Sequence, residues 1–176
     1  MRNLFLSALV PFVSLLVLVG CGPAAEPTTV EVKEVRFETL DDAIKDRKGK
    51  VVVVDFWATW CGPCVKKFPH LVELHKKYKE KGLVCVSVSM DKEGPKGSYD
   101  KEKVLKFLKD QDAVFPNFII ADPDGDEKKL NERFGKEGGI PFLAVFGKDG
   151  KKVWDSEQKK LKDEEIVKLI EDELSK

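Results

Sequence analysis

The chain lacks a net charge and has almost no histidine. Its 176 residues include 31 lysines and arginines, 31 aspartates and glutamates, and two histidines. A protein that binds nucleic acid needs a net basic face, so the balanced charge argues against that class of partner. The remaining composition, 42% hydrophobic and 35% charged, suits one globular domain with a modest core. The sequence also lacks internal repeats, low-complexity tracts and a nucleotide-binding motif.

Long apolar runs are missing too, except at the N-terminus. Residues 4–19 are almost wholly apolar and follow a positive start at Arg2. This run is short for a membrane span and typical of the apolar core of an export signal. It ends in Leu18-Val19-Gly20-Cys21, which resembles the bacterial lipobox, whose cysteine is acylated and becomes N-terminal after cleavage. We therefore expect a lipoprotein signal peptide over residues 1–20 and lipidation of Cys21; the alternatives are an ordinary signal peptide and an uncleaved anchor.

The residues that follow Cys21 are small and rich in proline. We expect a lipidated N-terminus and flexible tether over residues 21–34, and one folded domain over residues 35–176. The protein would then be exported and anchored by lipid to a bacterial membrane, facing the periplasm or the cell exterior. Cysteines in such a space can persist as disulfides. Because Cys21 belongs to the anchor, three cysteines remain for the domain: Cys61, Cys64 and Cys85.

Apolar runs with different periods predict alternating strands and helices along the domain. The β-branched run over residues 51–57 indicates a strand that is buried on both faces. Further strands are predicted at residues 30–37, 83–90 and 118–121, and a hairpin at 142–146 and 151–154. Helices are predicted at residues 41–47, 65–78, 104–108, 130–134 and 166–174, and a turn at 122–125. This order predicts an α/β fold, in which a mixed central sheet carries helices on both faces.

Two cysteines lie in Trp60-Cys61-Gly62-Pro63-Cys64, directly after the buried strand. Residues between such a strand and a helix lie at the C-terminal edge of the sheet, where open α/β sheets carry their sites. Cys61 would begin the helix, where unpaired N–H groups and the positive end of the dipole lower the pKa of a thiol. We therefore expect Cys61 to be the nucleophile, and Cys64, one turn further and more buried, to resolve the mixed disulfide. Pro63 suits the first helical turn and keeps the sulfurs within reach, and Gly62 leaves the backbone open to a partner chain.

Other uses of this cysteine pair are less well supported. A structural disulfide between residues three apart closes a very small loop and constrains the unfolded chain little. A metal site needs more ligands, and both His70 and His75 lie on the following helix, so we expect no metal. Covalent haem attachment requires a histidine directly after the second cysteine, where Val65 stands. The third cysteine of the domain, Cys85, lies in a neighbouring predicted strand and is expected to be a buried, inert thiol.

The segment from residue 54 to residue 64 resembles the active-site segment of thioredoxins. Its stretch F-W-A-T-W-C-G-P-C is typical of membrane-anchored thioredoxin-like proteins of the TlpA/ResA type. The resemblance extends to Pro69, at the place of a helix-kinking proline, and to Gly139-Ile140-Pro141, which resembles the family's cis-proline loop. Residues 94–134 resemble the extra strand and helix of the TlpA/ResA group. From about residue 35 to the C-terminus, the resemblance implies a thioredoxin fold.

The resemblance also implies roles for individual residues. Pro141 would be cis and face the two sulfurs, and the backbone of Ile140 would pair with a substrate segment as an added strand. Asp55 would be a buried acid, with its pKa raised by desolvation, that takes the proton from Cys64. Trp60 would shield the disulfide and offer an apolar surface to partners. The alternatives for these residues are a trans proline, an acid that reaches solvent and a tryptophan that only packs.

Two positions depart from the thioredoxin pattern. Ser87 stands where thioredoxin pairs its buried acid with a lysine, and Phe142 follows the cis-proline position where threonine is common. Many TlpA-like proteins also carry an uncharged residue at the position of Asp55 and use a glutamate elsewhere. These departures concern the groups around the proton path from Cys64.

The resemblance implies an extracytoplasmic thiol–disulfide oxidoreductase that reduces disulfides of partner proteins, with apocytochrome c as one target. A membrane thiol reductase would supply electrons to a monomer that needs no cofactor besides its redox-active Cys61–Cys64 disulfide. One alternative is a thiol peroxidase of the same fold, although Ala58 stands where peroxiredoxins usually place a threonine. The other alternative is a non-catalytic docking module, against which the intact cysteine pair argues.

Overall fold

The computed structural model of the chain describes residues 27–94 and 99–176. The signal peptide and lipidation site that the sequence predicts at residues 1–21 lie outside these ranges. The strands of the described part are β1 (Lys33–Val35), β2 (Val51–Trp57), β3 (Leu83–Ser89), β4 (Asn117–Ile120), β5 (Phe142–Phe146) and β6 (Lys152–Asp155). The helices are α1 (Phe37–Lys45), α2 (Gly62–Tyr78), α3 (Lys101–Asp110), α4 (Pro123–Phe134) and α5 (Asp163–Ser175), with short 3-10 helices η1 (Lys79–Lys81) and η2 (Asp91–Glu93).

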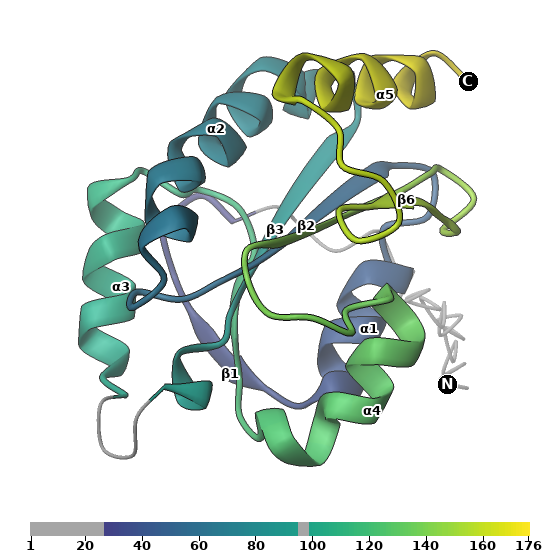
Figure 1. Cartoon of the computed structure of the whole chain (residues 1–176). Coiled ribbons are helices and arrows are strands. Elements are labelled where there is room, and N and C mark those ends of the chain that lie inside the picture. Colours follow the sequence, from purple (N-terminus) through teal and green to yellow (C-terminus); the bar gives the residue numbers. More distant parts are fainter. Residues whose placement is uncertain (1–26, 95–98) are drawn as a thin grey trace, which may run out of the picture.

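The strands form one mixed sheet with helices on both faces (Figure 1), which confirms the predicted α/β thioredoxin fold. The strand order is β1-β4-β3-β2-β5-β6. Neighbours from β1 to β2 pair in parallel, and β5 pairs antiparallel with both β2 and β6. Strand β2 therefore lies inside the sheet, paired with β3 along its whole length and with β5 over Val52–Phe56.

Alternate residues of β2 belong to two separate hydrophobic layers. Its even-numbered valines and Phe56 pack with residues of α1 and α4. Its odd-numbered valines and Trp57 pack with residues of α2, α3 and α5. Because side chains alternate across a strand, Asp55 is directed to the same face as Trp57, toward α2. Strand β2 thus places the carboxyl group of Asp55 in the layer that also contains α2.

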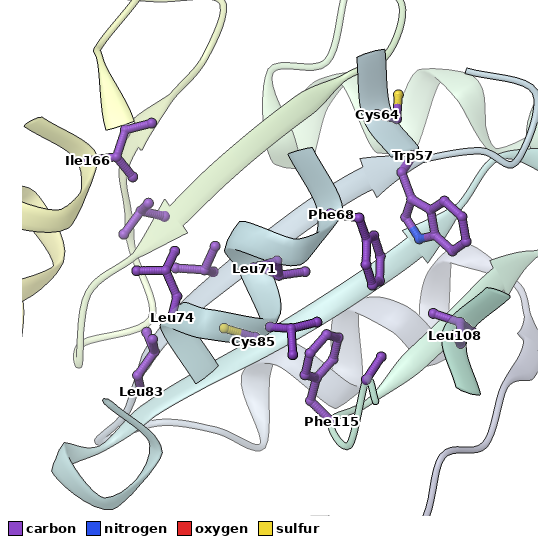
Figure 2. Packing of buried hydrophobic residues seen from close by; sticks show 14 of the residues in the cluster. Trp57, Cys64, Phe68, Leu71, Leu74, Leu83, Cys85, Leu108, Phe115 and Ile166 are labelled. Atoms are coloured by element: carbon purple, nitrogen blue, oxygen red, sulfur yellow. The ribbon is translucent and has the colours of Figure 1, made fainter. Parts of the chain in front are cut away.

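Aromatic contacts join the helices to the sheet on each face. The Trp57 ring lies 4.8 Å from that of Phe68 on α2 and 4.7 Å from that of Phe107 on α3, measured between centroids. Figure 2 shows Phe68 and Leu71 of α2 lying over the strands beside Trp57. On the opposite face, Phe134 of α4 lies 5.0 Å from Phe56 and makes an edge-to-face contact. These contacts fix α2 against the end of β2, where the cysteine pair follows.

The predicted starts of helices α1 and α4 are wrong. Helix α1 begins at Phe37 rather than at residue 41, because Asp126 accepts hydrogen bonds from Arg36 Nε at 2.8 Å and from the Phe37 N–H at 3.0 Å. The predicted turn at residues 122–125 is the first turn of α4, whose N-terminus is capped by Asp122 through a 3.1 Å bond from the Gly125 N–H. The Asp-Pro pair that indicates a turn also suits the start of a helix, and only the packing of Leu130 and Phe134 distinguishes the two.

No helix within residues 27–94 and 99–176 is long and apolar enough to cross a membrane.

The predicted strand over residues 30–37 is shorter in the structure, since β1 comprises only Lys33–Val35. Pro69 lies inside α2, where the sequence placed it.

Truncation of Phe134 tests the packing on the α1/α4 face. We expect Phe134→Ala to lower the free energy of unfolding by about 3–5 kcal/mol, because the ring is fully buried against two other rings. Urea denaturation of the oxidised protein measures this loss. The half-exposed Val153 of β6 gives the control, and Val153→Ala should change stability by less than about 0.5 kcal/mol. A loss below about 1 kcal/mol for Phe134→Ala would contradict the described packing.

Candidate active site

The two cysteines of the W-C-G-P-C segment form a disulfide at the start of α2, with their Cα atoms 5.2 Å apart. Cys61 is the N-cap residue of the helix, and its Sγ accepts a hydrogen bond of 3.3 Å from the Cys64 N–H. Cys61 is 6% exposed and Cys64 is 1% exposed. Cys61 is therefore the more accessible of the two residues, and the Cys64 N–H points at its sulfur.

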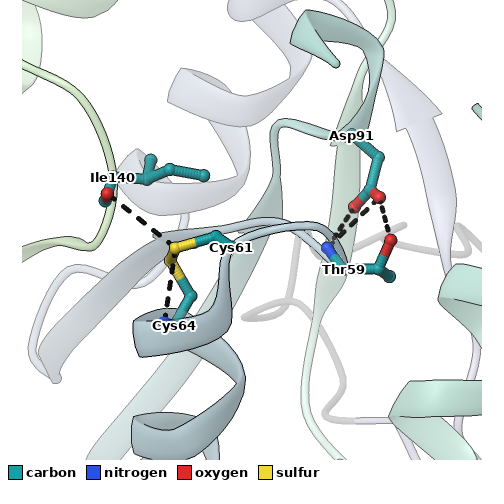
Figure 3. Close-up of a disulfide and its surroundings, with 5 residues drawn as sticks. All are labelled: Thr59, Cys61, Cys64, Asp91 and Ile140. Atoms are coloured by element: carbon teal, nitrogen blue, oxygen red, sulfur yellow. Dashed lines mark hydrogen bonds between the residues drawn. A yellow bond between two sulfur atoms is a disulfide. The ribbon is translucent and has the colours of Figure 1, made fainter. Parts of the chain in front are cut away.

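The loop before β5 lies against this disulfide (Figure 3). The Ile140–Pro141 peptide bond is cis, as the family resemblance implied. The carbonyl oxygen of Ile140 lies 3.8 Å from Cys61 Sγ, although the two residues are 79 positions apart in the sequence. A disulfide sulfur carries no hydrogen, so this contact can become a hydrogen bond only when Cys61 is a thiol.

The surface next to the disulfide is open. Trp60 is 46% exposed, which is unusual for so large an apolar side chain. A Cβ atom added at Gly62 or at Gly139 would meet nothing within 4 Å. Pro63 occupies the first turn of α2, where its missing N–H breaks no helical hydrogen bond. The residues that the sequence proposes for partner contact thus gather around the sulfur of Cys61.

Behind the disulfide, Asp55 and Cys64 line the same cavity, which has a volume of about 770 Å³. Helix α2, the cis-proline loop and the segment after β6 form its walls. Burial raises the pKa of Asp55 to about 7, and the positive charge of Lys67 acts in the opposite direction. A carboxyl group with this pKa can take up or release a proton near neutral pH. Asp55 and the more buried cysteine therefore share one cavity, and the role that the resemblance implies for Asp55 stays a prediction.

Lys67 is a residue that the sequence interpretation missed. It follows Cys64 by three positions on α2, so both side chains face the cavity. Ser87, which stands at thioredoxin's lysine position, instead donates a 2.7 Å hydrogen bond to Asn117 and is completely buried. The positive charge near Asp55 thus comes from α2 and not from β3. The helical spacing from Cys64 was the signal that could have revealed it.

Of the remaining candidates, Cys85 and His75 lie away from the disulfide, whereas His70 lines the cavity behind it. Cys85 is completely buried in β3, on the α2 side of the sheet (Figure 2). His75 is buried against the ring of Phe115 at 5.2 Å, and His70 Nδ1 lies 3.8 Å from a carboxylate oxygen of Glu73. Among residues 27–94 and 99–176, no group of three or more histidines, cysteines and acids is arranged to hold a metal ion.

The chain matches one family model and is similar in sequence to known thiol-disulfide oxidoreductases. The family model described as Redoxin matches residues 38–170. The thiol-disulfide oxidoreductase ResA of Bacillus thuringiensis subsp. konkukian (strain 97-27) is 37% identical over 131 residues, which cover 72% of this chain and 67% of that protein.

Solved structures of thioredoxin-like proteins also align with the chain. The thioredoxin domain of a thiol-disulfide oxidoreductase from Bacteroides vulgatus aligns with 73% of this chain and 81% of its own length, at 25% identity and a TM-score of 0.57. The exposed lipoprotein thioredoxin of Streptococcus pneumoniae strain TIGR4 covers 73% of this chain and 89% of its own, at 25% identity and a TM-score of 0.56. The sequence and fold relatives therefore carry the same class of chemistry.

Replacement of Asp55 tests its environment through the pH dependence of stability. Between pH 3.8 and about 7 the folded protein keeps a proton on Asp55 that the unfolded chain has lost, so the wild type loses stability as the pH rises through this window. Asp55→Asn cannot ionise. Its stability relative to the wild type should therefore increase from pH 4 to pH 8, by at most about 4 kcal/mol at about 1.4 kcal/mol per pKa unit.

Urea denaturation of the oxidised proteins at several pH values measures this difference. Asp149→Asn in the turn before β6 is the control. The Lys151 N–H lowers the pKa of Asp149 below its usual value, so both the folded and the unfolded chain carry the ionised form above about pH 4. The stability of this variant relative to the wild type should therefore stay nearly constant from pH 4 to pH 8. If the two variants show the same pH dependence, Asp55 is not the desolvated acid described here.

Proposed function

The chain belongs to the Redoxin family and is a thiol–disulfide oxidoreductase of the TlpA/ResA type; on this premise we propose that it reduces disulfides of partner proteins outside the cytoplasm. One observation supports the proposal above all others. The Cys61–Cys64 pair lies at the N-terminus of α2, with the more accessible sulfur 3.8 Å from the backbone of the cis-proline loop. A partner chain that reaches Cys61 therefore also reaches a backbone edge that can bind it.

The reaction begins with the reduced dithiol. The thiolate of Cys61 attacks one sulfur of the partner's disulfide, forming a mixed disulfide and releasing the partner's other sulfur as a thiolate, which takes a proton. Cys64, once deprotonated, attacks Cys61 Sγ, so that the Cys61–Cys64 bond forms and the partner's second thiolate leaves. Two electrons pass from the dithiol to the partner. A membrane thiol reductase restores the dithiol, and no other cofactor takes part.

In this proposal Asp55 accepts the proton of Cys64 during the second step. The support is that both residues line one cavity and that the pKa of the carboxyl group is about 7. The carboxylate form is then sufficiently populated near neutral pH to take a proton, and the cavity lets the proton exchange with solvent afterwards. Lys67 favours the ionised form of Asp55 by its charge and so adjusts this balance.

Partner binding uses the open surface around Cys61. The backbone of Ile140 pairs with an extended segment of the partner, and Trp60 packs against that segment from the other side. Gly62 and Gly139 leave room for the partner's backbone, since neither position has an atom within 4 Å of an added Cβ. Such a site recognises the main chain of the partner more than its side chains, which suits a reductase that acts on several proteins.

We further propose that the monomeric protein is a lipoprotein held at a bacterial membrane through Cys21, facing the periplasm or the cell exterior. The support is the lipobox-like segment and the similarity to a pneumococcal protein whose name describes it as an exposed lipoprotein. Disulfides form in such a space, so a reductase there has substrates. Apocytochrome c, whose cysteines must be reduced before haem attachment, is one proposed substrate.

Trapping of the mixed disulfide tests the proposed function. We expect Cys64→Ala, in the full chain at its membrane, to accumulate disulfide-linked partners on Cys61, because the resolving sulfur is gone. Non-reducing gels followed by mass spectrometry identify the partners. Cys85→Ala is the control and should trap none. An absence of adducts with Cys64→Ala would favour a docking module, and rapid peroxide consumption by the wild type would favour a peroxidase.

Removal of the lipid attachment site tests the location. We expect Cys21→Ala to lose the lipid and to move from the membrane fraction to the soluble extracytoplasmic fraction, because lipid attachment anchors the protein. Incorporation of labelled fatty acid and cell fractionation measure both effects. Should the variant still incorporate the label, Cys21 is not the acylated residue.

A further inference from the structure

The segment between β2 and the nucleophilic cysteine is short and irregular. It comprises Ala58, Thr59 and Trp60, and it ends in a turn closed by a 3.1 Å hydrogen bond from the Cys61 N–H to the Ala58 carbonyl. The position of Cys61 at the start of α2 therefore depends on how these three residues are held. Trp60 points outward and is half-exposed, so it cannot supply that support by burial.

Asp91, the first residue of η2 just after β3, forms hydrogen bonds to the middle residue of this segment. The backbone N–H of Thr59 lies within hydrogen-bond distance of both carboxylate oxygens of Asp91, at 3.1 and 3.2 Å. The Thr59 hydroxyl donates a further bond to the same carboxylate. Figure 3 shows Asp91 and Ile140 on opposite sides of the Cys61 segment. The carboxylate of Asp91 thus fixes Thr59, which lies two positions before the nucleophile Cys61.

The gripping carboxylate is itself fixed. Asp91 is 4% exposed, and Ser89 at the end of β3 donates a 2.7 Å hydrogen bond to its second oxygen. The preceding residue, Met90, donates its N–H to the Trp57 carbonyl at 2.7 Å, which ties the end of β3 to the end of β2. Thr59 and Ser89 both donate hydrogen bonds to this carboxylate, so both of its oxygens have donors in fixed positions.

We infer that Asp91 is a positioning residue, which through Thr59 holds Cys61 Sγ against the Cys64 N–H and the Ile140 carbonyl. The inference rests on the exchange chemistry of Cys61 and goes beyond it, since Asp91 contacts neither sulfur nor partner. Its effect follows from geometry. If Thr59 is released, Cys61 can move away from the start of α2, where backbone N–H groups stabilise its thiolate. A misplacement of about 1 Å slows a reaction by as much as about 100-fold.

The experiment uses the reduced full-length protein and needs no protein partner. The rate of alkylation of Cys61 by iodoacetamide as a function of pH gives both the pKa of the thiol and its reactivity, and equilibration with glutathione gives the redox equilibrium constant. We expect Asp91→Ala to raise the pKa of the Cys61 thiol and to slow alkylation at pH 7 by about tenfold. Asp91→Asn keeps an oxygen acceptor for Thr59 and should restore most of the rate.

Asp126 supplies the matched control. It is also a buried acid, and its carboxylate accepts a hydrogen bond from the Phe37 N–H. It lies on α4, on the face of the sheet opposite to α2 and the cysteine pair. We expect Asp126→Ala to lower the denaturant midpoint as Asp91→Ala does, and to leave the alkylation profile of Cys61 unchanged. If Asp91→Ala also leaves that profile and the glutathione equilibrium unchanged, Asp91 has only a structural role and the inference is wrong.

A second outcome would also overturn the inference. If Asp91→Asn and Asp91→Ala lower the pKa of the Cys61 thiol equally, Asp91 acts through its negative charge and not by positioning. Thr59→Val adds an independent arm, because it keeps the backbone bond to Asp91 and loses only the hydroxyl bond. Its alkylation rate should lie between those of the wild type and Asp91→Ala. Failure of the wild type to reduce partner disulfides would count against the proposed function and not against this clamp, since alkylation requires no disulfide.

Discussion

The burial of β2 on both faces is the constraint on which the rest of the molecule depends. Its valines and aromatic residues are held between two layers of helices, so the strand can end at only one place. The cysteine pair follows that end directly, and Phe68 and Leu71 fix α2 over the same strands. The sulfur of Cys61 therefore meets the Cys64 N–H at the start of a helix that is packed against the sheet. Hydrophobic packing thus creates the electrostatic environment of a thiolate.

The same packing explains why the site has two sides with different properties. Toward solvent, Trp60 and the open glycine positions expose the more accessible sulfur and the backbone of the cis-proline loop. Toward the interior, the cavity between α2 and the cis-proline loop contains Asp55, which desolvation keeps close to its protonation midpoint at neutral pH. The two sulfurs therefore have different surroundings: Cys61 lies toward the open surface, and Cys64 lines the cavity that also contains Asp55. In this arrangement, Lys67 of α2 supplies the charge that a lysine on the neighbouring strand supplies in thioredoxin.

Much of this arrangement could be predicted from local patterns. The β-branched run of β2, the W-C-G-P-C segment and the Gly-Ile-Pro segment each carry a strong local signal, and all three have the predicted structure. The start of α1 could not be predicted, because it is fixed by hydrogen bonds from Arg36 and Phe37 to Asp126, about 90 positions away. The turn predicted before α4 failed for a different reason, since Asp-Pro suits both a turn and a helix start. Asp91 gave no signal, because an acid after a strand is common in loops.

The sequence by itself determined the chemistry: two thiols at a strand–helix junction, a proline that suits the first helical turn and an acid in an otherwise apolar strand. These features depend on local propensity and on which residue types can react, and both can be read from neighbouring residues. Only the tertiary structure decided which groups meet the sulfurs. The Ile140 carbonyl and the carboxylate of Asp91 come from segments far from Cys61 in the sequence, and residues after position 137 close the cavity that Asp55 and Cys64 line. Their positions follow from the pairing order of the strands, which depends on how all the buried surfaces fit together and not on any local pattern.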